Sequence, residues 1–233
     1  MRRNVSIILS CEHAGNKVPS RYRPLFEGHP DILKTHRGYD LGIAPIAKAM
    51  SKRLDCPLWQ YEWTRLLIEP NRTRTTALFS TFTQMLGPSE KQDLIDSYYL
   101  PYRNGLDRLI GEHCRKSITL HLSMHSFTPV LNGCERNADI GILYDPARQR
   151  EQRFAIALQK ALRSVSDYRI RRNYPYAGKA DGLTTWFRKR TRPTEYLGIE
   201  IELNQGLLTS PTHHVNAMGQ LLTGAIEVCQ NIS

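Results

Sequence analysis

The chain has 233 residues and a mass of 26.8 kDa, enough for one large α/β domain with a substantial core. Hydrophobic residues make up 40% and charged residues 23%, without repeats or low-complexity runs, which excludes a disordered or fibrous protein. No run approaches the ~18 apolar residues that a membrane helix needs. The formal net charge of +10 leaves nucleic acid, an anionic lipid surface and a small acidic substrate open as partners.

The N-terminal residues and the cysteines indicate the compartment. The first apolar run is too short and badly flanked for a signal peptide, so we expect a cytoplasmic protein. The five cysteines are scattered and form no CxxC pair, which argues against a disulfide framework or a cysteine zinc site. Any metal would therefore be held by His, Asp or Glu.

Apolar patterning predicts strands and helices in alternation along the chain. Strands are expected at residues 5–11, 57–62, 118–124, 139–144 and 196–203, and helices at 41–54, 88–116 with a break near Pro101, 151–164, and about 212–231. This order predicts a three-layer α/β fold, with residues 1–233 forming a single domain.

Two histidines follow predicted strands. His13 comes just after the first strand, and His125 comes directly after the strand at 118–124. Functional residues gather at strand ends in such sheets, so the two rings can converge on one point, as a histidine-based zinc site requires. A capping or hydrogen-bonding role is the alternative. His121 lies inside its strand and is expected to pack rather than bind.

Three carboxylates could serve the same site. Glu200 and Glu202 alternate with apolar residues in the strand at 196–203, so both lie on one face. Two like charges this close require a cation, donors or a raised pKa, and such a carboxylate can act as general base for a metal-bound water. A solvent-facing edge strand is the alternative. Asp40 precedes the helix at 41–54 and could simply cap it.

Arg65, Asn71 and Arg72 frame a short apolar run. Guanidinium groups near a core bind carboxylates bidentately, so these residues suggest a receptor for an anionic substrate. Structural pairing of the arginines with Glu62 or Glu69 is the alternative.

Residues 169–192 are strongly basic, with Asp181 as their one acid and aromatic residues interleaved. This composition suits RNA or single-stranded DNA, although the stretch contains no recognised nucleic-acid module. Pro175, Gly178 and Gly182 instead indicate a structured loop that could cover a site. A nucleic-acid-binding or otherwise non-catalytic protein is therefore the alternative to an enzyme.

Taken in order, these segments resemble the N-formylglutamate amidohydrolase family, a branch of zinc-dependent amide hydrolases. The matching segments are 11–19 (CEHAGNKVP), 39–42 (YDLG), 64–65 (TR) through 71–72 (NR), 125–129 (HSFTP), 139–143 (DIGIL), 173–176 (NYPY) and 201–204 (IELN). The resemblance implies a fold similar to the zinc carboxypeptidases and aspartoacylases, with a mixed central sheet between helical layers.

The resemblance also implies a zinc site. His13 and His125 match the histidines that hold Zn²⁺ with one carboxylate in the wider group. Those relatives often show His-x-x-Glu, whereas here Asn16 stands three residues after His13. Cell-wall amidases of similar fold take the carboxylate from further along the chain, which makes Asp40 the preferred third ligand. Glu12 and His36 are weaker candidates.

The remaining roles follow from the same resemblance. Glu202 matches the glutamate that activates water, and Arg65 looks like the arginine that polarises the scissile carbonyl. Asn71 and Arg72 look like the pair that grips the substrate carboxylate. The implied reaction is hydrolysis of the C–N amide bond of a small acidic N-acyl amino acid, such as N-formyl-L-glutamate, to formate and glutamate. A different peptide-like amide is the alternative substrate.

Overall fold

The structure is a computed structural model that describes residues 4–73, 78–208 and 212–229. Its centre is a six-stranded sheet in the order β2-β1-β3-β8-β6-β7. The strands are β1 (Val5–Cys11), β2 (Leu58–Gln60), β3 (Ile118–Phe127), β6 (Ile140–Leu143), β7 (Ile170–Arg172) and β8 (Tyr196–Asn204). The first four in spatial order are parallel, whereas β6 pairs antiparallel with β8 and β7 pairs parallel with β6. The sheet is therefore mixed, as predicted.

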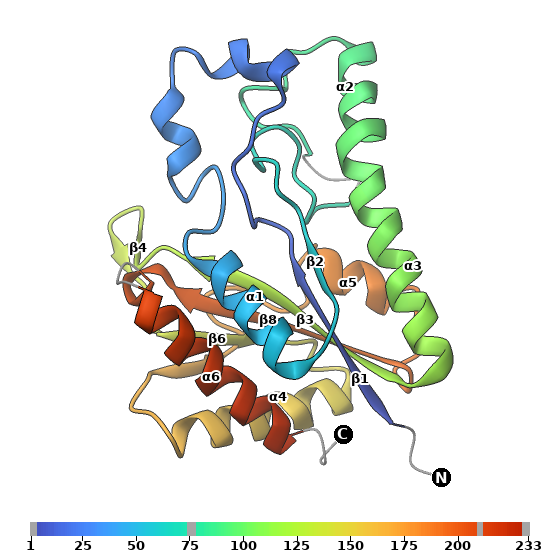
Figure 1. The fold of residues 1–233 in the computed structure, drawn as a ribbon, viewed down its shortest axis with the longest axis vertical. Helices are drawn as coiled ribbons and strands as arrows, with labels where there is room; N and C mark the ends of the chain where they lie inside the picture. The colour runs from blue at the N-terminus through green and yellow to red at the C-terminus, as the bar shows by residue number, and fades with distance from the viewer. Residues whose placement is uncertain (1–3, 74–77, 209–211, 230–233) are drawn as a thin grey trace.

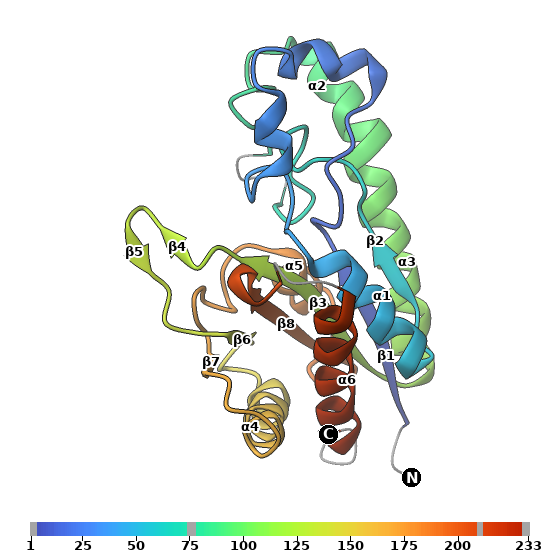
Figure 2. The same ribbon diagram turned by 60° about the vertical axis from the view of Figure 1, so that its left-hand side comes forward.

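Helices cover both faces of this sheet, which confirms the predicted three-layer α/β fold (Figure 1, Figure 2). One layer holds α1 (Ile43–Leu54), α4 (Gln149–Arg163) and α6 (Thr212–Cys229), and the other holds α3 (Leu100–Lys116) and α5 (Leu183–Arg188). The remaining elements are α2 (Pro88–Leu94), β4 (Val130–Leu131), β5 (Cys134–Glu135) and the short turns η1 (Ser20–Phe26), η2 (Pro30–Lys34), η3 (Ile95–Tyr99) and η4 (Gln205–Leu207). In Figure 1, α2 and the turns η1 and η2 lie above the sheet.

Strand β3 shows how the sequence gives the sheet two different faces. Leu120 and Leu122 point into an apolar core shared with α1, α4 and α6. The alternate residues His121, Ser123 and His125 are also buried, and they point to the opposite face. One face of the sheet is thus an ordinary hydrophobic core, and the other carries buried polar groups.

Several predicted elements have different ends. β3 continues to Phe127, so His125 lies inside the strand rather than after it. The C-terminal helix is α6, which is described to Cys229, while the last predicted residues, 230–231, lie outside the described residues. Residues 1–3, part of the segment on which the signal-peptide argument rests, also lie outside them. Among the described helices, none has both the length and the apolar character needed to cross a membrane.

The predicted break near Pro101 is absent. The helical segment continues from α2 through η3, a π-helical turn, into α3, where Pro101 stands in the first turn. Proline has no N–H for the usual bond to the residue four positions back. The wider turn accommodates this change, because the Leu100 N–H donates to the carbonyl of Ile95, five residues back.

The basic stretch at 169–192 is more regular than the loop that its sequence predicts. It contains β7 and α5, which have only three and six residues. Elements this short show too few residues for a hydrophobic period to be recognised. The stretch therefore contributes the edge strand of the sheet and a helix packed on β8.

One arginine of this stretch, Arg188, is buried in an ion pair with Glu151. Its Nε donates to both carboxylate oxygens at 3.0 Å, and its two terminal nitrogens donate to the carbonyls of Gly178 at 2.6 Å and Gly198 at 2.7 Å. Glu151 also accepts from the backbone N–H groups of Asp145 and Gly198. Arg188 therefore fastens the loop around Gly178 to β8 and α4.

We expect Arg188→Met to lower the free energy of unfolding by about 3–5 kcal/mol, because the charge of Glu151 would remain buried without its partner. Arg190→Met is the matched control, since Arg190 lies 3.6 Å from Asp107 in an exposed pair, and should cost less than about 1 kcal/mol. Urea denaturation of both variants measures the difference. Equal losses would contradict the structural role of Arg188.

Candidate active site

The site forms where β1 and β3 end side by side in parallel. His13 follows β1, and His125 lies near the end of β3. The backbone N–H of Asp40 donates to the His13 carbonyl at 3.0 Å, which brings the segment before α1 to the same place. The helix is capped at Gly42, whose φ is 76°, and no side chain caps it. The carboxylate of Asp40 faces the histidines instead of capping the helix.

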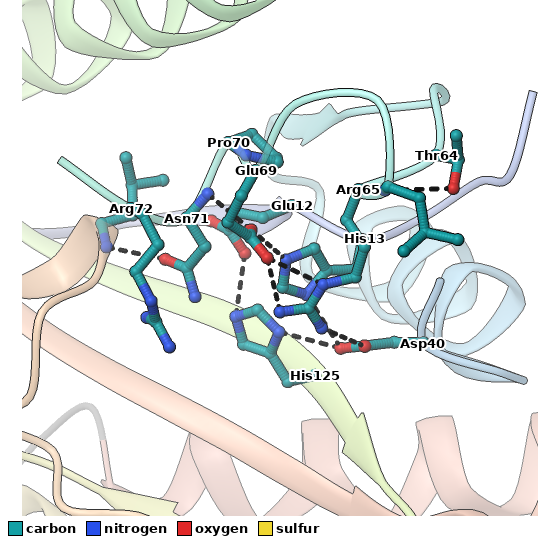
Figure 3. Close-up of polar contacts among 12 residues, drawn as sticks. Glu12, His13, Asp40, Thr64, Arg65, Glu69, Pro70, Asn71, Arg72 and His125 are labelled. Atoms are coloured by element: carbon teal, nitrogen blue, oxygen red, sulfur yellow. Dashed lines mark hydrogen bonds and ion pairs between the residues drawn. The ribbon is translucent and has the colours of Figure 1, made fainter. Parts of the chain in front are cut away.

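Both histidines present Nδ1 to the same carboxylate oxygen. Asp40 Oδ2 lies 3.3 Å from His13 Nδ1 and 2.9 Å from His125 Nδ1 (Figure 3). All three residues are buried, and one ligand atom from each lies within 4.8 Å of the others. Burial alone would raise the pKa of Asp40, but the two histidines hold it well below its usual range.

The second nitrogen of each ring contacts another carboxylate. His13 Nε2 lies 2.6 Å from Glu69 Oε1, and His125 Nε2 lies 3.0 Å from Glu12 Oε2. Glu12 thus contacts the ring nitrogen that faces away from Asp40. His36 is exposed. Among the three carboxylate or histidine candidates for a third ligand, Asp40 is the one that lies with His13 and His125.

Glu202 lies beside this group in the interior of the sheet. β8 runs between β3 and β6, with Glu202 in register with His125, so the edge-strand alternative is wrong. Its Oε2 is buried and has no hydrogen-bond partner among the residues that the structure describes. Burial raises the pKa of Glu202 to about 8. The negative charges of Asp40 and Glu200 also raise this pKa, whereas His125 and Arg65 lower it.

The donor set fits a catalytic zinc ion. Two imidazole nitrogens and one carboxylate oxygen form a common ligand set of zinc sites that keep a position open. Both Nε2 atoms contact carboxylates, the arrangement that orients metal-binding histidines in proteins. A cation held beside Glu202, whose Oε2 has no partner among the described residues, would favour the ionised carboxylate against the burial that raises its pKa.

Arg65 has structural partners as well as a place in the site. Its Nη2 lies 2.5 Å from Glu69 Oε2, and its Nη1 lies 3.5 Å from Asp40 Oδ1. The pairing with Glu69 that the sequence left open is therefore present, whereas Glu62 pairs with Lys17. Because it is held by two carboxylates, the guanidinium is fixed at the edge of the site.

Asn71 and Arg72 are fixed by the basic stretch. Asn71 Oδ1 accepts from the Leu183 N–H at 2.7 Å, and Arg72 Nη1 donates to the carbonyl of Asp181. Both side chains are therefore held against residues that follow β7. The loop expected to cover a site does lie against it.

All seven site residues predicted from the sequence line one cavity of about 170 Å³. This volume is below the roughly 300–1,000 Å³ of pockets that take drug-sized ligands, which favours a small substrate. The other lining residues are Ser126, Tyr176, Ala177, Ala180, Asp181 and Glu200.

Sequence reasoning missed the roles of Glu69 and Glu12. The sequence suggests Glu69 only as a partner for an arginine, and it does not show the contact of Glu69 with His13. It suggests Glu12 only as a metal ligand, and it does not show the contact of Glu12 with His125 Nε2. Nothing in the local pattern shows which ring nitrogen a carboxylate will contact, because His13 and Glu69 are 56 positions apart.

Comparison with known proteins identifies the family. The cavity of this mixed α/β fold contains a buried His-Asp-His group that could hold a metal ion. The sequence matches the N-formylglutamate amidohydrolase family over residues 5–209, so the chain belongs to that family and is an amidohydrolase by membership. No curated protein sequence matches it.

Solved structures share this fold. A gene product of Agrobacterium tumefaciens is 24% identical with a TM-score of 0.84, and the match covers 99% of this chain and 92% of that one. An N-formylglutamate amidohydrolase from Ralstonia eutropha is 17% identical with a TM-score of 0.67, over 99% and 94% of the two chains. These likenesses show that the chain shares its fold with both structures.

The buried carboxyl of Glu202 predicts a pH effect in metal-stripped protein. Its pKa is about 8 in the folded chain against 4.5 for an ordinary glutamate, so the folded state binds more protons between these values. The stability it contributes is full below about pH 4.5 and is lost as the pH rises through about 8. Between pH 5 and pH 8, wild type should therefore lose roughly 3–4 kcal/mol relative to Glu202→Gln.

Urea unfolding of the two metal-stripped proteins at both pH values measures this difference. Glu202→Gln is the matched control because its amide mimics the protonated carboxyl. A stability difference that stays constant with pH would show that Glu202 ionises normally in the folded protein.

Proposed function

We propose that the protein is a zinc-dependent amidohydrolase that cleaves the C–N bond of an N-acyl amino acid such as N-formyl-L-glutamate, giving formate and glutamate. The observation that carries this proposal is that Glu202 lines one cavity with the His13–Asp40–His125 group and has a buried oxygen without a partner among the described residues. A general base and a metal-ligand set next to each other are what amide hydrolysis by activated water requires.

His13 and His125, through Nδ1, and Asp40, through its carboxylate, would hold the zinc ion. When bound, zinc lowers the pKa of a water toward ~7 and polarises a carbonyl oxygen. The rest of the chemistry belongs to the side chains of the cavity.

Glu202 takes the proton from the attacking water as the water oxygen adds to the acyl carbon. It then delivers that proton to the amide nitrogen, so that the C–N bond breaks and the amine leaves neutral. Arg65, fixed by Glu69 and Asp40, stabilises the negative charge that develops on the carbonyl oxygen. Asn71 and Arg72 hold the substrate carboxylate.

We also propose that the partner is a small molecule rather than nucleic acid. Two arginines of the basic stretch pair with carboxylates of the same chain: Arg188 is buried against Glu151, and Arg169 lies 3.0 Å from Asp139. Both hydrophobic clusters pack on the one sheet, in keeping with residues 1–233 acting as one domain.

The five cysteines are unpaired, which suits the cytoplasm.

A second candidate substrate is a different peptide-like amide, and Glu200 is the observation that favours it. This carboxylate lines the cavity and accepts a hydrogen bond from Thr184. It would repel a substrate that carries two carboxylates and would attract one with an amino group. Comparing Glu200→Gln with wild type on N-formyl-glutamate and N-formyl-lysine distinguishes the two candidates.

Zinc-loaded protein should release formate from N-formyl-L-glutamate, and Glu202→Gln should lower kcat by about 10²–10⁴-fold because the general base is lost. Formate is measured with a coupled dehydrogenase assay, and bound zinc is measured in the same samples. Full activity in Glu202→Gln would contradict its role as the base.

Arg72→Met provides the control for substrate binding. We expect it to raise KM by about 10-fold or more while bound zinc is retained, because a charge-assisted hydrogen bond to the carboxylate is lost. An unchanged KM would show that the substrate carboxylate binds elsewhere.

A further inference from the structure

A buried chain of hydrogen bonds runs along the polar face of the sheet to His125. It starts at Tyr196 in β8, whose hydroxyl lies 2.7 Å from His121 Nδ1. His121 Nε2 lies 2.7 Å from Ser10 Oγ, which lies 2.5 Å from Glu12 Oε1. The other oxygen of Glu12 lies 3.0 Å from His125 Nε2. All five residues are buried, and the proposed reaction uses His125 alone among them.

The direction of this chain follows from Glu12. A carboxylate with no exposed surface is tolerated only when its oxygens accept hydrogen bonds. Oε1 accepts from Ser10, and Oε2 accepts from Ser123 at 2.9 Å and forms an ion pair with His125 Nε2 at 3.0 Å. The Glu12 carboxylate is therefore surrounded by donors from both β1 and β3.

The donors further along the chain are then fixed in turn. A serine hydroxyl has one proton, and Ser10 gives it to Glu12, so Ser10 must accept from His121 Nε2. Burial lowers the pKa of His121 to about 4, which keeps this ring neutral. Its Nδ1 therefore accepts from the hydroxyl of Tyr196. His121 packs within the sheet, as the sequence predicts.

The same logic fixes the ring of His125. Its Nε2 lies 2.9 Å from Ser123 Oγ and 3.0 Å from Glu12 Oε2. Ser123 gives its one proton to Glu12, so it must accept from Nε2, and this nitrogen carries a proton. Its Nδ1 is left facing Asp40 Oδ2 at 2.9 Å, on the side of the cavity. A flipped ring would turn a nitrogen away from the cavity and leave a buried oxygen of Glu12 without one of its donors.

We propose that Glu12 is a positioning residue, which holds His125 through Nε2 in the tautomer and orientation that present Nδ1 to the metal. This inference rests on the proposed function, because it takes His125 to be a metal ligand. Ser10, His121 and Tyr196 keep Glu12 in place. Glu69 contacts His13 in the same way but is shared with Arg65, so Glu12 offers the clearer test.

The test is the zinc affinity of the full chain, purified without a His-tag, stripped with a chelator and titrated against a chromophoric competitor. Glu12→Gln keeps the size of the side chain but removes its charge. We expect it to weaken zinc binding by about 10–100-fold, the usual effect of losing such a partner. The visible spectrum of the cobalt-substituted protein should change as well, because the geometry around His125 is altered.

Glu151→Gln is the matched control, since Glu151 is equally buried and paired with Arg188 outside the cavity. It should destabilise the fold yet change zinc affinity by less than about twofold. Equal zinc affinity in Glu12→Gln and wild type would overturn the inference. An equal loss of zinc affinity in both variants would also overturn the inference, because the lower stability of the fold would then explain the weaker binding.

If Glu12→Gln does not fold, Ser10→Ala tests the same chain by removing one donor to Glu12. We expect zinc binding to weaken about 3–10-fold, and unchanged affinity would overturn the inference. A wild-type protein that binds no zinc would instead contradict the proposed function itself, so the two failures are distinguishable.

Discussion

The burial of three carboxylates, those of Glu12, Asp40 and Glu202, close to the ends of β1, β3 and β8 is the constraint on which the rest of the site depends. A charge removed from water costs several kcal/mol unless donors or opposite charges surround it. Asp40 has two imidazoles and the backbone N–H of Ser126 at 3.2 Å. Glu12 has its serines and His125. Glu202 keeps one oxygen without a partner among the described residues, and it is the carboxylate that we propose as the base.

Apolar burial on the opposite face of the sheet offsets the free-energy cost of burying these carboxylates. There the alternate residues of β1, β3 and β8 are apolar and pack against α1, α4 and α6. Apolar burial of this kind is the main favourable contribution to folding, at roughly 25 cal/mol per Å². The layer that holds α3 and α5 covers the other face, on which the polar residues and the cavity lie. Stability and chemistry are thus divided between the two sides of one sheet.

Local sequence patterns predicted much of the fold and most of the residues around the cavity. Period-two alternation placed Glu200 and Glu202 on one face, and the strand ends brought His13 and His125 together. The order of the motifs indicated the family and the mixed sheet. The three-residue strand β7, the six-residue helix α5 and the π-helical turn before Pro101 were not predicted, because each is too short to produce a period or depends on a single missing N–H.

Contacts between distant residues could not be read from the sequence. The contacts of Glu69 with His13 and of Glu12 with His125 depend on how strands and loops are placed in space, and no local spacing records them. The same holds for Arg188, which the sequence shows only as one of several cations in the basic stretch and which is buried against Glu151. In each case burial, which forces charges to find partners, decided the role of the residue.

Elemental analysis of tag-free protein tests most directly the proposal that His13, His125 and Asp40 hold a zinc ion. Wild type should contain about one zinc per chain, and His13→Ala, His125→Ala and Asp40→Ala should each lose it while remaining folded. Absence of zinc from wild type after incubation with the metal would contradict the proposal. Zinc retained in Asp40→Ala alone would contradict the assignment of the third ligand.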